Sequence, residues 1–399
     1  MKLKFVNLGC KVNLNETEEL KRACYEEGYE IVGEEDQADL VIINSCTVTH
    51  ISDRKSRQKI SQAKRDGALV AVMGCYVDIH GEIDADLLIP NAKKDEALEA
   101  IKGLLGGVGG PGLTEGFNYD KTRAFLKVQD GCNNFCSYCI IPYARGRSRS
   151  YSYERIEAEL DRFIEAGFNE IVLTGINLSA YGKDTDSSLG ELIKTLSPKL
   201  GDRRLRLGSL EVHVIDSQFL EICRGLAGFC PQFHLSLQSG SDGVLKRMNR
   251  RYNSQEYKER VELIREYFPE AAITTDIIVG YPEESPEEFQ ETLEFVKEIN
   301  FSHVHVFSYS PRAGTVAASK LDHHPQTKKD RSQILRDLVE KQKEDYLDSF
   351  IGREVEVLFE EDNSGLSREY IQCYSRDSKE NNSIEVLRVL KREGSILLV

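Results

Sequence analysis

The 399-residue sequence predicts an α/β protein with an N-terminal parallel α/β domain, a (β/α)6 partial barrel and a small C-terminal antiparallel β-barrel. Short apolar runs alternate with helical patterns, and this alternation restarts after residues 102–116, which contain seven glycines and one proline. From Gly352 onward, apolar and polar residues instead alternate with the period of two that is typical of strands. We therefore expect domains at 1–105, 121–350 and 351–399, with a glycine-rich linker at 106–120.

The N-terminal domain is predicted from four apolar runs, each followed by a loop or a helical pattern. The expected strands are KLKFVNL, DLVII, ALVAVMG and DLLI, as parallel strands of an α/β sheet. A first helix is expected from about Glu16, with Asn15 as its cap and Glu18 in its first turn. Further helices are expected from about Ser52 and near Asp95.

The barrel is predicted from six strand candidates, each followed by a helical or loop segment. They are AFLKVQD, EIVLTG, RLRLGSLE, FHLSLQ, AITTDIIVG and HVHVFSY. Ser285 with Glu288 predicts a capped helix start, and a long charged helix is expected over residues 326–350. In the C-terminal module, the expected strands are REVEVLF, EYIQCYS and SIEVLRVL.

Composition excludes some classes of protein. Hydrophobic residues make up 40% of the chain, and no run approaches the roughly 18 apolar residues of a membrane span. No signal peptide is recognisable, so we expect a cytoplasmic location. The net charge of −14 argues against indiscriminate binding to nucleic acid, and the ten cysteines of a reducing compartment are expected to be metal ligands, catalytic thiols or core residues.

Three cysteines lie on one short loop directly after the first barrel strand. Cys132, Cys136 and Cys139 have C-x3-C-x2-C spacing, which suits one face of an iron–sulfur cube. A 4Fe-4S cluster normally takes four cysteines, so three would leave one iron open. The alternatives are a zinc site and a chance cluster of buried thiols.

Three other cysteines each follow a predicted parallel strand. Cys10, Cys46 and Cys75 should converge, because ligands bind at the carboxyl ends of the strands in open α/β sheets. They predict a second metal site, with burial as small hydrophobic residues as the alternative. That alternative is favoured for the cysteines without such placement, which are Cys24, Cys223, Cys230 and Cys373.

Polar residues share faces of several barrel strands and predict a cavity that is lined by polar side chains. The alternatives are that these residues are hydrogen-bonded within the core or face outward. These residues are Arg204 and Arg206, His234, Ser236 and Gln238, and His303, His305, Phe307 and Tyr309. Gly280-Tyr281-Pro282 ends the fifth strand as either a simple turn or a cofactor-contacting loop.

Local basic patches favour an RNA partner despite the net negative charge of the chain. Residues 53–65 carry six basic residues and one acidic residue. Further patches are Arg145, Arg147 and Arg149, and Lys246, Arg247, Arg250 and Arg251. Solvated helix faces are the alternative, and Arg145, Arg147 and Arg149 could instead line a cofactor or substrate cavity. Small β-barrels commonly bind single-stranded RNA, which supports the RNA interpretation.

The chain resembles the methylthiotransferase family of radical S-adenosylmethionine enzymes over essentially its whole length. The motifs that carry the resemblance are NLGCKVNLNETE, INSCTVT, ISDRKSRQKI, GCNNFCSYCIIPYARGRSRS, LTGINLSAYG, HLSLQSGSD, TDIIVGYPEE and FSYSPRAGT. The resemblance implies that Cys132, Cys136 and Cys139 bind the 4Fe-4S cluster that cleaves S-adenosylmethionine, and that Cys10, Cys46 and Cys75 bind a second, auxiliary 4Fe-4S cluster. It further implies cofactor contacts from Tyr138, Thr174, Gly175, Asn177 and Gln238.

The CKVN and SDRKSRQ segments resemble the branch that acts on N6-threonylcarbamoyladenosine beside the anticodon of transfer RNA. The implied chemistry uses one S-adenosylmethionine to methylate sulfur at the auxiliary cluster and another to form a 5′-deoxyadenosyl radical, which removes hydrogen from carbon 2 of the adenine. The implied partners are an electron donor such as flavodoxin or ferredoxin, a sulfur source, and the transfer RNA anticodon loop. The RNA contacts are assigned to Arg54, Lys55, Arg57, Arg145, Arg147 and Arg149, and the C-terminal module is implied to be a TRAM-type RNA-binding domain.

The sequence is also consistent with other functions. The same chemistry could act on isopentenyladenosine in transfer RNA or on an aspartate of a ribosomal protein, and a protein of another class would be a non-catalytic iron–sulfur or zinc RNA-binding protein. The sequence departs from the family pattern at Glu283, where a glycine is usual, and at Val212 and Val316, where prolines are common. The C-terminal module is also short. These departures bear on loop details and RNA docking more than on chemistry.

Overall fold

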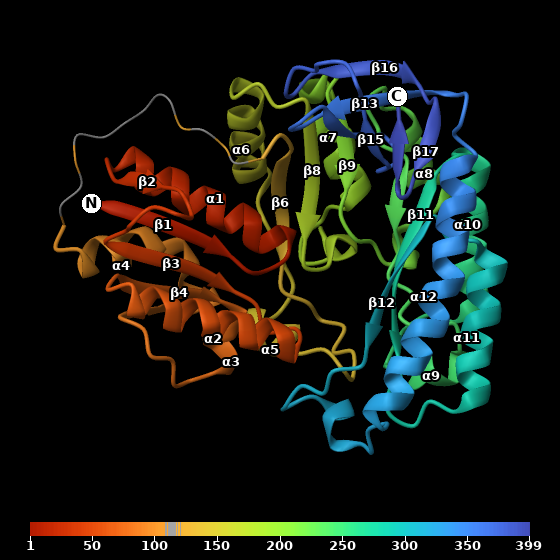
Figure 1. Ribbon diagram of the computed structural model, residues 1–399, viewed down its shortest axis with the longest axis horizontal. Helices are drawn as coiled ribbons and strands as arrows, with labels where there is room; N and C mark the ends of the chain where they lie inside the picture. The colour runs from red at the N-terminus through yellow and green to blue at the C-terminus, as the bar shows by residue number, and fades with distance from the viewer. Residues whose placement is uncertain (108–109, 111–116, 118, 120) are drawn as a thin grey trace. The chain divides into compact units, whose positions relative to one another are not determined.

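The computed structural model describes residues 1–107, 110, 117, 119 and 121–399, which divide into two compact units (Figure 1). Unit 1 comprises Met1–Asp120, Gly131–Arg147 and Ser310–Thr315. Unit 2 comprises Lys121–Asp130, Ser148–Tyr309 and Val316–Val399. The loop with the C-x3-C-x2-C motif therefore belongs to the same unit as the N-terminal sheet. Much of the predicted glycine-rich linker lies outside the described residues.

Unit 1 is built on a five-stranded parallel sheet with the order β2-β1-β3-β4-β5, as the alternating pattern predicts. Its strands are β1 (Lys2–Asn7), β2 (Glu30–Val32), β3 (Leu40–Ser45), β4 (Leu69–Gly74) and β5 (Leu87–Ile89). Its helices are α1 (Lys11–Glu26), α2 (His50–Arg65), α3 (Cys75–Ile79), α4 (Ala97–Leu104) and α5 (Ile141–Arg145).

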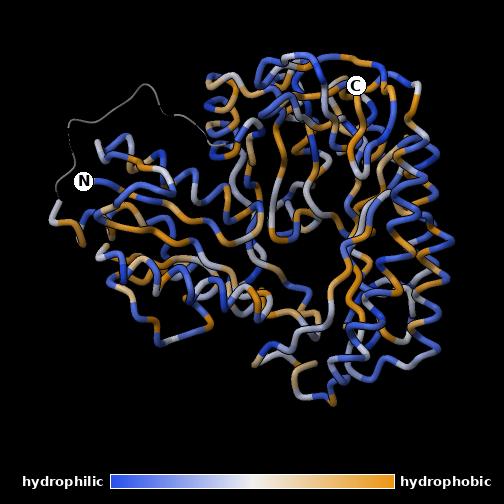
Figure 2. The backbone as a smooth tube through the Cα atoms, viewed as in Figure 1, coloured by the Kyte–Doolittle hydropathy of each residue, from blue (hydrophilic) through white to orange (hydrophobic). Residues whose placement is uncertain are grey.

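Helices cover both faces of this sheet, which is why β3 and β4 are apolar at nearly every position (Figure 2). On one face, Leu20 and Cys24 of α1 and Ile101 of α4 pack against Ile42 and Ala71. On the other face, Ile60 and Ala63 of α2 pack against Val41, Ile43, Val70 and Val72. The carboxyl ends of the strands remain as the place where functional side chains can gather.

The predicted start of the first helix is wrong by five residues. Helix α1 begins at Lys11 with Cys10 at the N-cap position, so Asn15 lies inside the helix and caps nothing. Asn13 and Asn15 are buried there, and the Asn13 amide donates to Asn44 Oδ1 at 2.7 Å. The short strand β2 was not predicted.

The barrel strands of unit 2 form two sheets, with the orders β7-β6-β8-β9 and β10-β11-β12. They are β6 (Ala124–Asp130), β7 (Arg149–Ser150), β8 (Glu170–Gly175), β9 (Arg204–Leu207), β10 (Gln232–His234), β11 (Ala272–Val279) and β12 (His303–Ser308). Isolated parallel bridges, Leu205 to Phe229 and Leu210 to Leu235, connect the two sheets. The antiparallel strand β7 occupies the outer edge of β6, so the structure confirms a partial rather than a closed barrel.

The helices of unit 2 lie on the outside of these strands (Figure 1). They are α6 (Tyr153–Glu165), α7 (Leu189–Leu200), α8 (Ser217–Arg224), α9 (Asp242–Arg247), α10 (Ser254–Tyr267), α11 (Pro286–Ile299) and α12 (Pro325–Asp348). The predicted capping box at Ser285 and Glu288 is confirmed at the start of α11. The long helix predicted over residues 326–350 is α12.

The C-terminal module is a six-stranded sheet with the order β16-β13-β14-β15-β18-β17. Its strands are β13 (Glu354–Phe359), β14 (Ser364–Ser367), β15 (Gln372–Tyr374), β16 (Ile384–Arg388), β17 (Lys391–Glu393) and β18 (Ile396–Leu398). All neighbours are antiparallel except β15 and β18, which are parallel. Its core packs on Leu347 and Phe350 at the end of α12.

The module docks on the amino ends of the barrel strands. Arg204 and Arg206 of β9 donate to the main-chain oxygens of residues 366–368 at distances of 2.8–3.1 Å. Asn382 exchanges hydrogen bonds with the turn before β8, donating to Gly167 O and accepting from Asn169. This leaves the carboxyl ends of the barrel strands, where reactive groups usually lie, uncovered by the module. Among the described helices, none combines the length and apolar character needed to cross a membrane.

Candidate iron–sulfur and nucleic-acid site

Cys10, Cys46 and Cys75 follow the carboxyl ends of β1, β3 and β4, which are neighbours in the parallel sheet. Cys10 precedes α1 and Cys75 begins α3. Burial raises the pKa of Cys46, and the neighbouring Cys75 and Cys10 thiols raise it further, so the three lie within electrostatic reach of one another. Thiols at the ends of neighbouring strands suit a bound metal, whose positive charge favours the thiolate form.

Gly74 makes the close approach of β4 to β3 possible. Its φ is +95°, in the left-handed region, and a Cβ atom there would lie 2.4 Å from the Ser45 main-chain oxygen. Only glycine fits, which brings Cys75 beside the end of β3. Cys10 Sγ lies 3.3 Å from Asn13 Oδ1, and Asn13 in turn donates to Asn44 Oδ1 and to Ser45 O.

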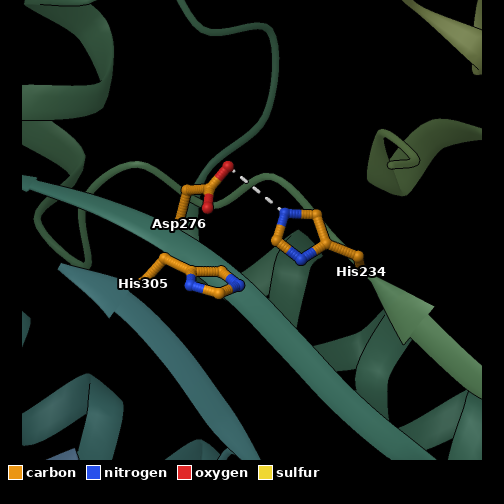
Figure 3. Close-up of side chains that lie close together, drawn as sticks. All are labelled: His234, Asp276 and His305. Atoms are coloured by element: carbon orange, nitrogen blue, oxygen red, sulfur yellow. Dashed lines mark hydrogen bonds and ion pairs between the residues drawn. The ribbon is translucent and has the colours of Figure 1, made fainter. Parts of the chain in front are cut away.

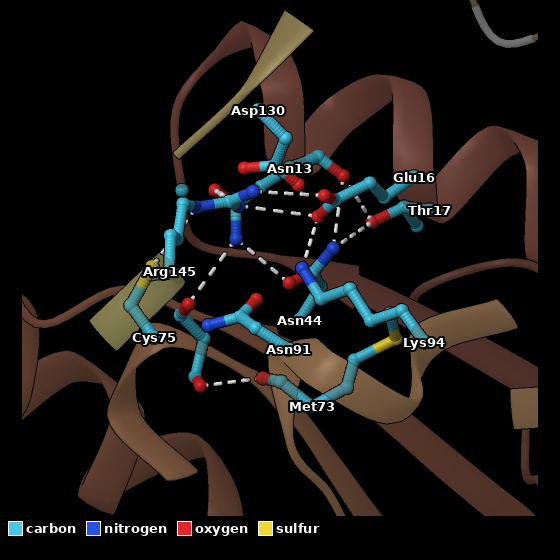
Figure 4. A network of polar contacts seen from close by, with 12 residues as sticks. Asn13, Glu16, Thr17, Asn44, Met73, Cys75, Asn91, Lys94, Asp130 and Arg145 are labelled. Atoms are coloured by element: carbon cyan, nitrogen blue, oxygen red, sulfur yellow. Dashed lines mark hydrogen bonds and ion pairs between the residues drawn. The ribbon is translucent and has the colours of Figure 1, made fainter. Parts of the chain in front are cut away.

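A buried charged network adjoins Cys75 (Figure 4). Arg145, only 2% exposed, donates from Nε to Cys75 Sγ at 3.3 Å and from Nη1 to Glu16 Oε1 at 2.9 Å. Glu16 also pairs with Lys94, and burial lowers the pKa of that lysine while the Glu16 carboxylate opposes the shift. Arg145 ends α5, the helix that follows the cysteine-bearing loop, so this network connects Cys75 to that helix within unit 1.

Cys132, Cys136 and Cys139 lie on the loop between β6 and α5, as predicted. Cys132 N–H donates to Gly146 O at 3.2 Å, which closes the loop, and Cys139 N–H donates to Cys136 O at 2.9 Å. Gly131 has a φ of +68°, and a Cβ atom there would lie 2.0 Å from Arg147 O. A closed loop that bears three cysteines fits a cluster with three protein ligands.

The expected cofactor-contacting residues of unit 2 lie at or just beyond the ends of barrel strands. Thr174 and Gly175 end β8, and Asn177 N–H donates to the buried Gln129 Oε1 at 2.8 Å. Gln238 follows β10 with a φ of +74°, unusual for a residue with a side chain. Tyr138 lies on the cysteine-bearing loop of unit 1. Thr174 and Gly175 end β8 as predicted, whereas β10 ends at His234, four residues before Gln238, so Ser236 and Gln238 do not continue that strand as predicted. The contacts with a cofactor stay predictions.

The basic helix α2 has an exposed face. Arg54, Lys55 and Arg57 are exposed and line a groove of about 910 Å³ on unit 1. Lys59 and Arg65 line the same groove, so five cations gather over one helix. Exposed guanidinium and ammonium groups in a groove are suited to phosphate oxygens.

The other basic residues divide into exposed and buried groups. Arg147 and Arg149 are exposed, with Arg147 over the Phe135 ring and Arg149 paired with Asp130. The sequence pattern places Arg145 on a surface open to RNA. The structure instead buries Arg145 in the network described above. Arg250 is buried against Glu211 and Tyr252, which removes it from the third basic patch.

The polar barrel residues do not behave alike. Arg204 and Arg206 are at most 1% exposed and both pair with Glu170, so they are satisfied core residues and the expectation that they line a cavity is wrong. The reason is their place at the amino end of β9, under the C-terminal module. On the second sheet, His305 and Phe307 are exposed, which agrees with an open inner face.

Four cysteines are core residues, in agreement with the favoured prediction. Cys24, Cys223, Cys230 and Cys373 are fully buried, and burial raises the pKa of each thiol. Sequence reasoning missed Glu16, Asn13, Asn44 and Lys94, which surround the Cys75 side of the site. Their signal was weak, because a polar residue inside a helix or strand is read as solvent-facing until its partner is known.

Two family models match the chain. The radical SAM superfamily model matches residues 126–296, and the model described as uncharacterized protein family UPF0004 matches residues 2–88. The first match includes the C-x3-C-x2-C loop and the first five barrel strands, and the second includes Cys10, Cys46 and Cys75.

Full-length relatives agree with both matches. The threonylcarbamoyladenosine tRNA methylthiotransferase MtaB of Aquifex aeolicus is 39% identical, over 95% of this chain and 98% of its own length. The enzyme of the same name from Thermotoga maritima is 37% identical, over 88% and 85%. The tRNA-2-methylthio-N6-dimethylallyladenosine synthase of Clostridium tetani is 33% identical, over 88% and 84%.

Among solved structures, the radical S-adenosylmethionine methyltransferase TsrM from Kitasatospora setae has a similar fold. The TM-score is 0.58 at 13% identity, and the match covers 77% of this chain and 72% of that one. At this identity the likeness concerns the fold alone.

Proposed function

Because the chain belongs to the methylthiotransferase family of radical S-adenosylmethionine enzymes, we propose that it inserts a methylthio group at carbon 2 of N6-threonylcarbamoyladenosine beside the anticodon of transfer RNA. One observation carries the proposal. The three strand-end cysteines and the three-cysteine loop occupy one compact unit, linked by Arg145. A radical enzyme that only cleaves S-adenosylmethionine needs one such set, whereas methylthio transfer needs a second place that holds sulfur.

In this proposal, Cys132, Cys136 and Cys139 bind the 4Fe-4S cluster used with S-adenosylmethionine. When bound, cluster and cofactor together supply one-electron reductive cleavage of the cofactor and thus a carbon radical. The loop holds its three thiols through the Cys132 to Gly146 closure. Thr174, Gly175, Asn177 and Gln238 at the strand ends, with Tyr138 on the loop, are the residues proposed to hold S-adenosylmethionine.

Cys10, Cys46 and Cys75 bind the auxiliary 4Fe-4S cluster in the same proposal. Cys10 lies at the N-cap position of the sixteen-residue helix α1, beside the positive end of the helix dipole. Arg145 donates to Cys75 Sγ and adds a buried positive charge. Both features place positive potential beside sulfur atoms that would ligate iron.

Transfer RNA binds through the α2 groove and the exposed arginines near the cysteine loop. Phosphate oxygens of the RNA would pair with Arg54, Lys55 and Arg57. The RNA backbone next to the target base would contact Arg147 and Arg149. Single-stranded loops are the usual targets of RNA-modifying enzymes because their bases can be splayed out. The C-terminal module is the proposed TRAM-type RNA-binding part, and an electron donor and a sulfur source complete the partners in the cytoplasm.

A comparison of cysteine variants tests this division of labour. Cys136→Ala should lose both 5′-deoxyadenosine release and product, since its thiol holds the cluster that cleaves the cofactor. Cys46→Ala should keep 5′-deoxyadenosine release and lose methylthio transfer. Cys223→Ala, a buried thiol outside both sets, is the matched control and should keep both activities. A Cys46→Ala enzyme that still makes methylthio product would contradict the proposal.

The isopentenyladenosine substrate remains the second candidate. The relative from Clostridium tetani, named for dimethylallyladenosine, is 33% identical, which is close to the 37% of the Thermotoga relative. The greater identity and coverage of the Aquifex relative favour the threonylcarbamoyl substrate.

A further inference from the structure

Three side chains with metal-binding atoms meet on neighbouring strands of the second barrel sheet (Figure 3). His234 ends β10, Asp276 lies in β11 and His305 lies in β12. Asp276 is the register partner of His305, and His234 is the partner of Thr274, two residues before Asp276. Because residues two apart share one face of a strand, the three side chains lie on the same face of the sheet.

The distances among these side chains are short enough for one ion. His234 Nε2 lies 3.2 Å from Asp276 Oδ2. One donor atom from each of the three residues lies within 4.8 Å of the other two. In a four-coordinate zinc site with ligand bonds near 2.0–2.1 Å, donor atoms are roughly 3.3 Å apart, so small rotations of the side chains suffice.

A hydrogen bond at the other ring nitrogen orients the His234 imidazole. Its Nδ1 lies 3.0 Å from Thr274 Oγ1, which also accepts from Gln232 Nε2 at 3.1 Å. If Nδ1 carries the proton, its N–H donates a hydrogen bond to Thr274 Oγ1, and the Nε2 lone pair faces Asp276. A ligating histidine is commonly fixed in this way by a hydrogen bond from its other ring nitrogen.

Charge and access also suit a cation. Within the part of the chain that the structure describes, the basic side chain near the Asp276 carboxylate is the His234 imidazole at 3.2 Å, and no lysine or arginine forms a salt bridge with it. The Asp276 side chain is 30% exposed, that of His234 is 14% exposed, and His305 is exposed. One carboxylate and two imidazoles therefore form a solvent-accessible set with a negative charge.

We propose that His234, Asp276 and His305 bind a divalent transition-metal ion, independently of the six cysteines. Imidazole with carboxylate selects ions such as Zn²⁺, Fe²⁺ or Co²⁺ over the harder Mg²⁺ and Ca²⁺. An ion with three protein ligands keeps at least one position for water or for an oxygen of a bound molecule. The site adds a metal centre on the inner face of the barrel to the methylthiotransferase chemistry.

Cobalt(II) titration of the full-length, anaerobically reconstituted protein tests this site. Cluster loading occupies the cysteines, and oxidised 4Fe-4S clusters are diamagnetic, so the electron paramagnetic resonance signal of high-spin Co²⁺ reports the new site. We expect one Co²⁺ per chain by equilibrium dialysis, with nitrogen and oxygen ligands. His305→Ala and Asp276→Asn should each weaken binding by at least about tenfold.

His303→Ala is the matched control, because His303 lies on the same strand and its ring packs at 4.5 Å from that of His305, outside the set of three. It should bind Co²⁺ as the parent does. Circular dichroism and iron content show that each variant is folded and loaded. Absence of Co²⁺ binding in the parent, equal affinity in His305→Ala, or a Co²⁺ signal from thiolate ligands would overturn the proposal. These outcomes are independent of turnover, so they are separate from a failure of the proposed function.

Discussion

Glu283 has a backbone conformation that favours glycine. Its φ is +64°, in the left-handed region, directly after the Gly280-Tyr281-Pro282 turn where a glycine is usual in the family pattern. A side chain in this region costs about 1–2 kcal/mol. Glu283→Gly should therefore raise the free energy of unfolding by about 0.5–1 kcal/mol, after the greater freedom of glycine in the unfolded chain is subtracted.

Urea denaturation measures this change. The control is Glu259→Gly, at an exposed position inside helix α10, which should lower stability by about 1 kcal/mol. A loss of stability in both variants would show that the Glu283 side chain contributes more than its backbone conformation costs.

Arg145 is expected to tune the auxiliary cluster. Its N–H donates to Cys75 Sγ at 3.3 Å, and hydrogen bonds and positive charge near cluster sulfurs favour the reduced state. In the full chain with Cys132, Cys136 and Cys139 changed to Ala, Arg145→Lys should lower the reduction potential of the remaining cluster while it retains the charge beside Glu16. Redox titration followed by electron paramagnetic resonance measures the shift, with Arg147→Lys as the exposed control. An unchanged potential at full iron content would contradict this role.

Some residues of the candidate site can be predicted from the sequence, and others cannot. Local spacing was enough to find Cys132, Cys136 and Cys139, and strand ends were enough to find Cys10, Cys46 and Cys75. Arg145 could not be assigned, because its partner Glu16 is 129 positions away and only the folded unit brings them together. A run of basic residues is predicted to lie on the surface unless the carboxylate that pairs with it is known.

Among the elements, α11 and α1 show the strength and the failure of capping rules. At α11, Glu288 N–H donates to Ser285 Oγ and Ser285 N–H donates to Glu288 Oε2, at 3.2 and 2.9 Å, as the box predicts. At α1, an equally suitable pattern at Asn15 and Glu18 is overruled, because the helix extends back to Lys11. Capping patterns mark possible starts, and buried contacts select among them.

The α11 cap gives a direct prediction. Ser285→Ala should lower the free energy of unfolding by about 1 kcal/mol, because the Glu288 N–H loses its side-chain acceptor. Thermal and urea unfolding measure the loss. Ser285→Thr keeps a hydroxyl and should stay close to the parent, whereas an equal loss in both variants would attribute the effect to packing.

For the molecule as a whole, the fold class and the order of elements were predictable and the docking of the C-terminal module was not. Periodicity identifies the strands, but nothing local shows that Arg204 and Arg206 bind main-chain oxygens about 160 residues later. Glu170 forms ion pairs with both arginines. Although burial alone would raise its pKa, Arg206 and Arg204 hold the pKa of Glu170 below its usual value.

Glu170→Gln should therefore destabilise the protein by about 3–5 kcal/mol at neutral pH, because two buried arginines lose their counter-ion. Since the folded-state pKa is depressed, the contribution of Glu170 is fully present above its unfolded pKa of about 4.3 and is lost as pH falls through the folded value. Urea denaturation at pH 7 and at a series of pH values below about 4 should show the stabilities of the two proteins converging as pH falls. Glu157→Gln, at a partly exposed pair with Lys199, should cost under about 1 kcal/mol.

The most direct test of the central claim is nucleoside mass spectrometry after anaerobic turnover of the reconstituted protein with S-adenosylmethionine, a reductant and a sulfide source. Parallel reactions receive transfer RNA with N6-threonylcarbamoyladenosine and transfer RNA with isopentenyladenosine. We expect a methylthio mass gain on the threonylcarbamoyl nucleoside alone. A gain on the isopentenyl nucleoside alone, or on neither while 5′-deoxyadenosine is released, would contradict the proposed substrate.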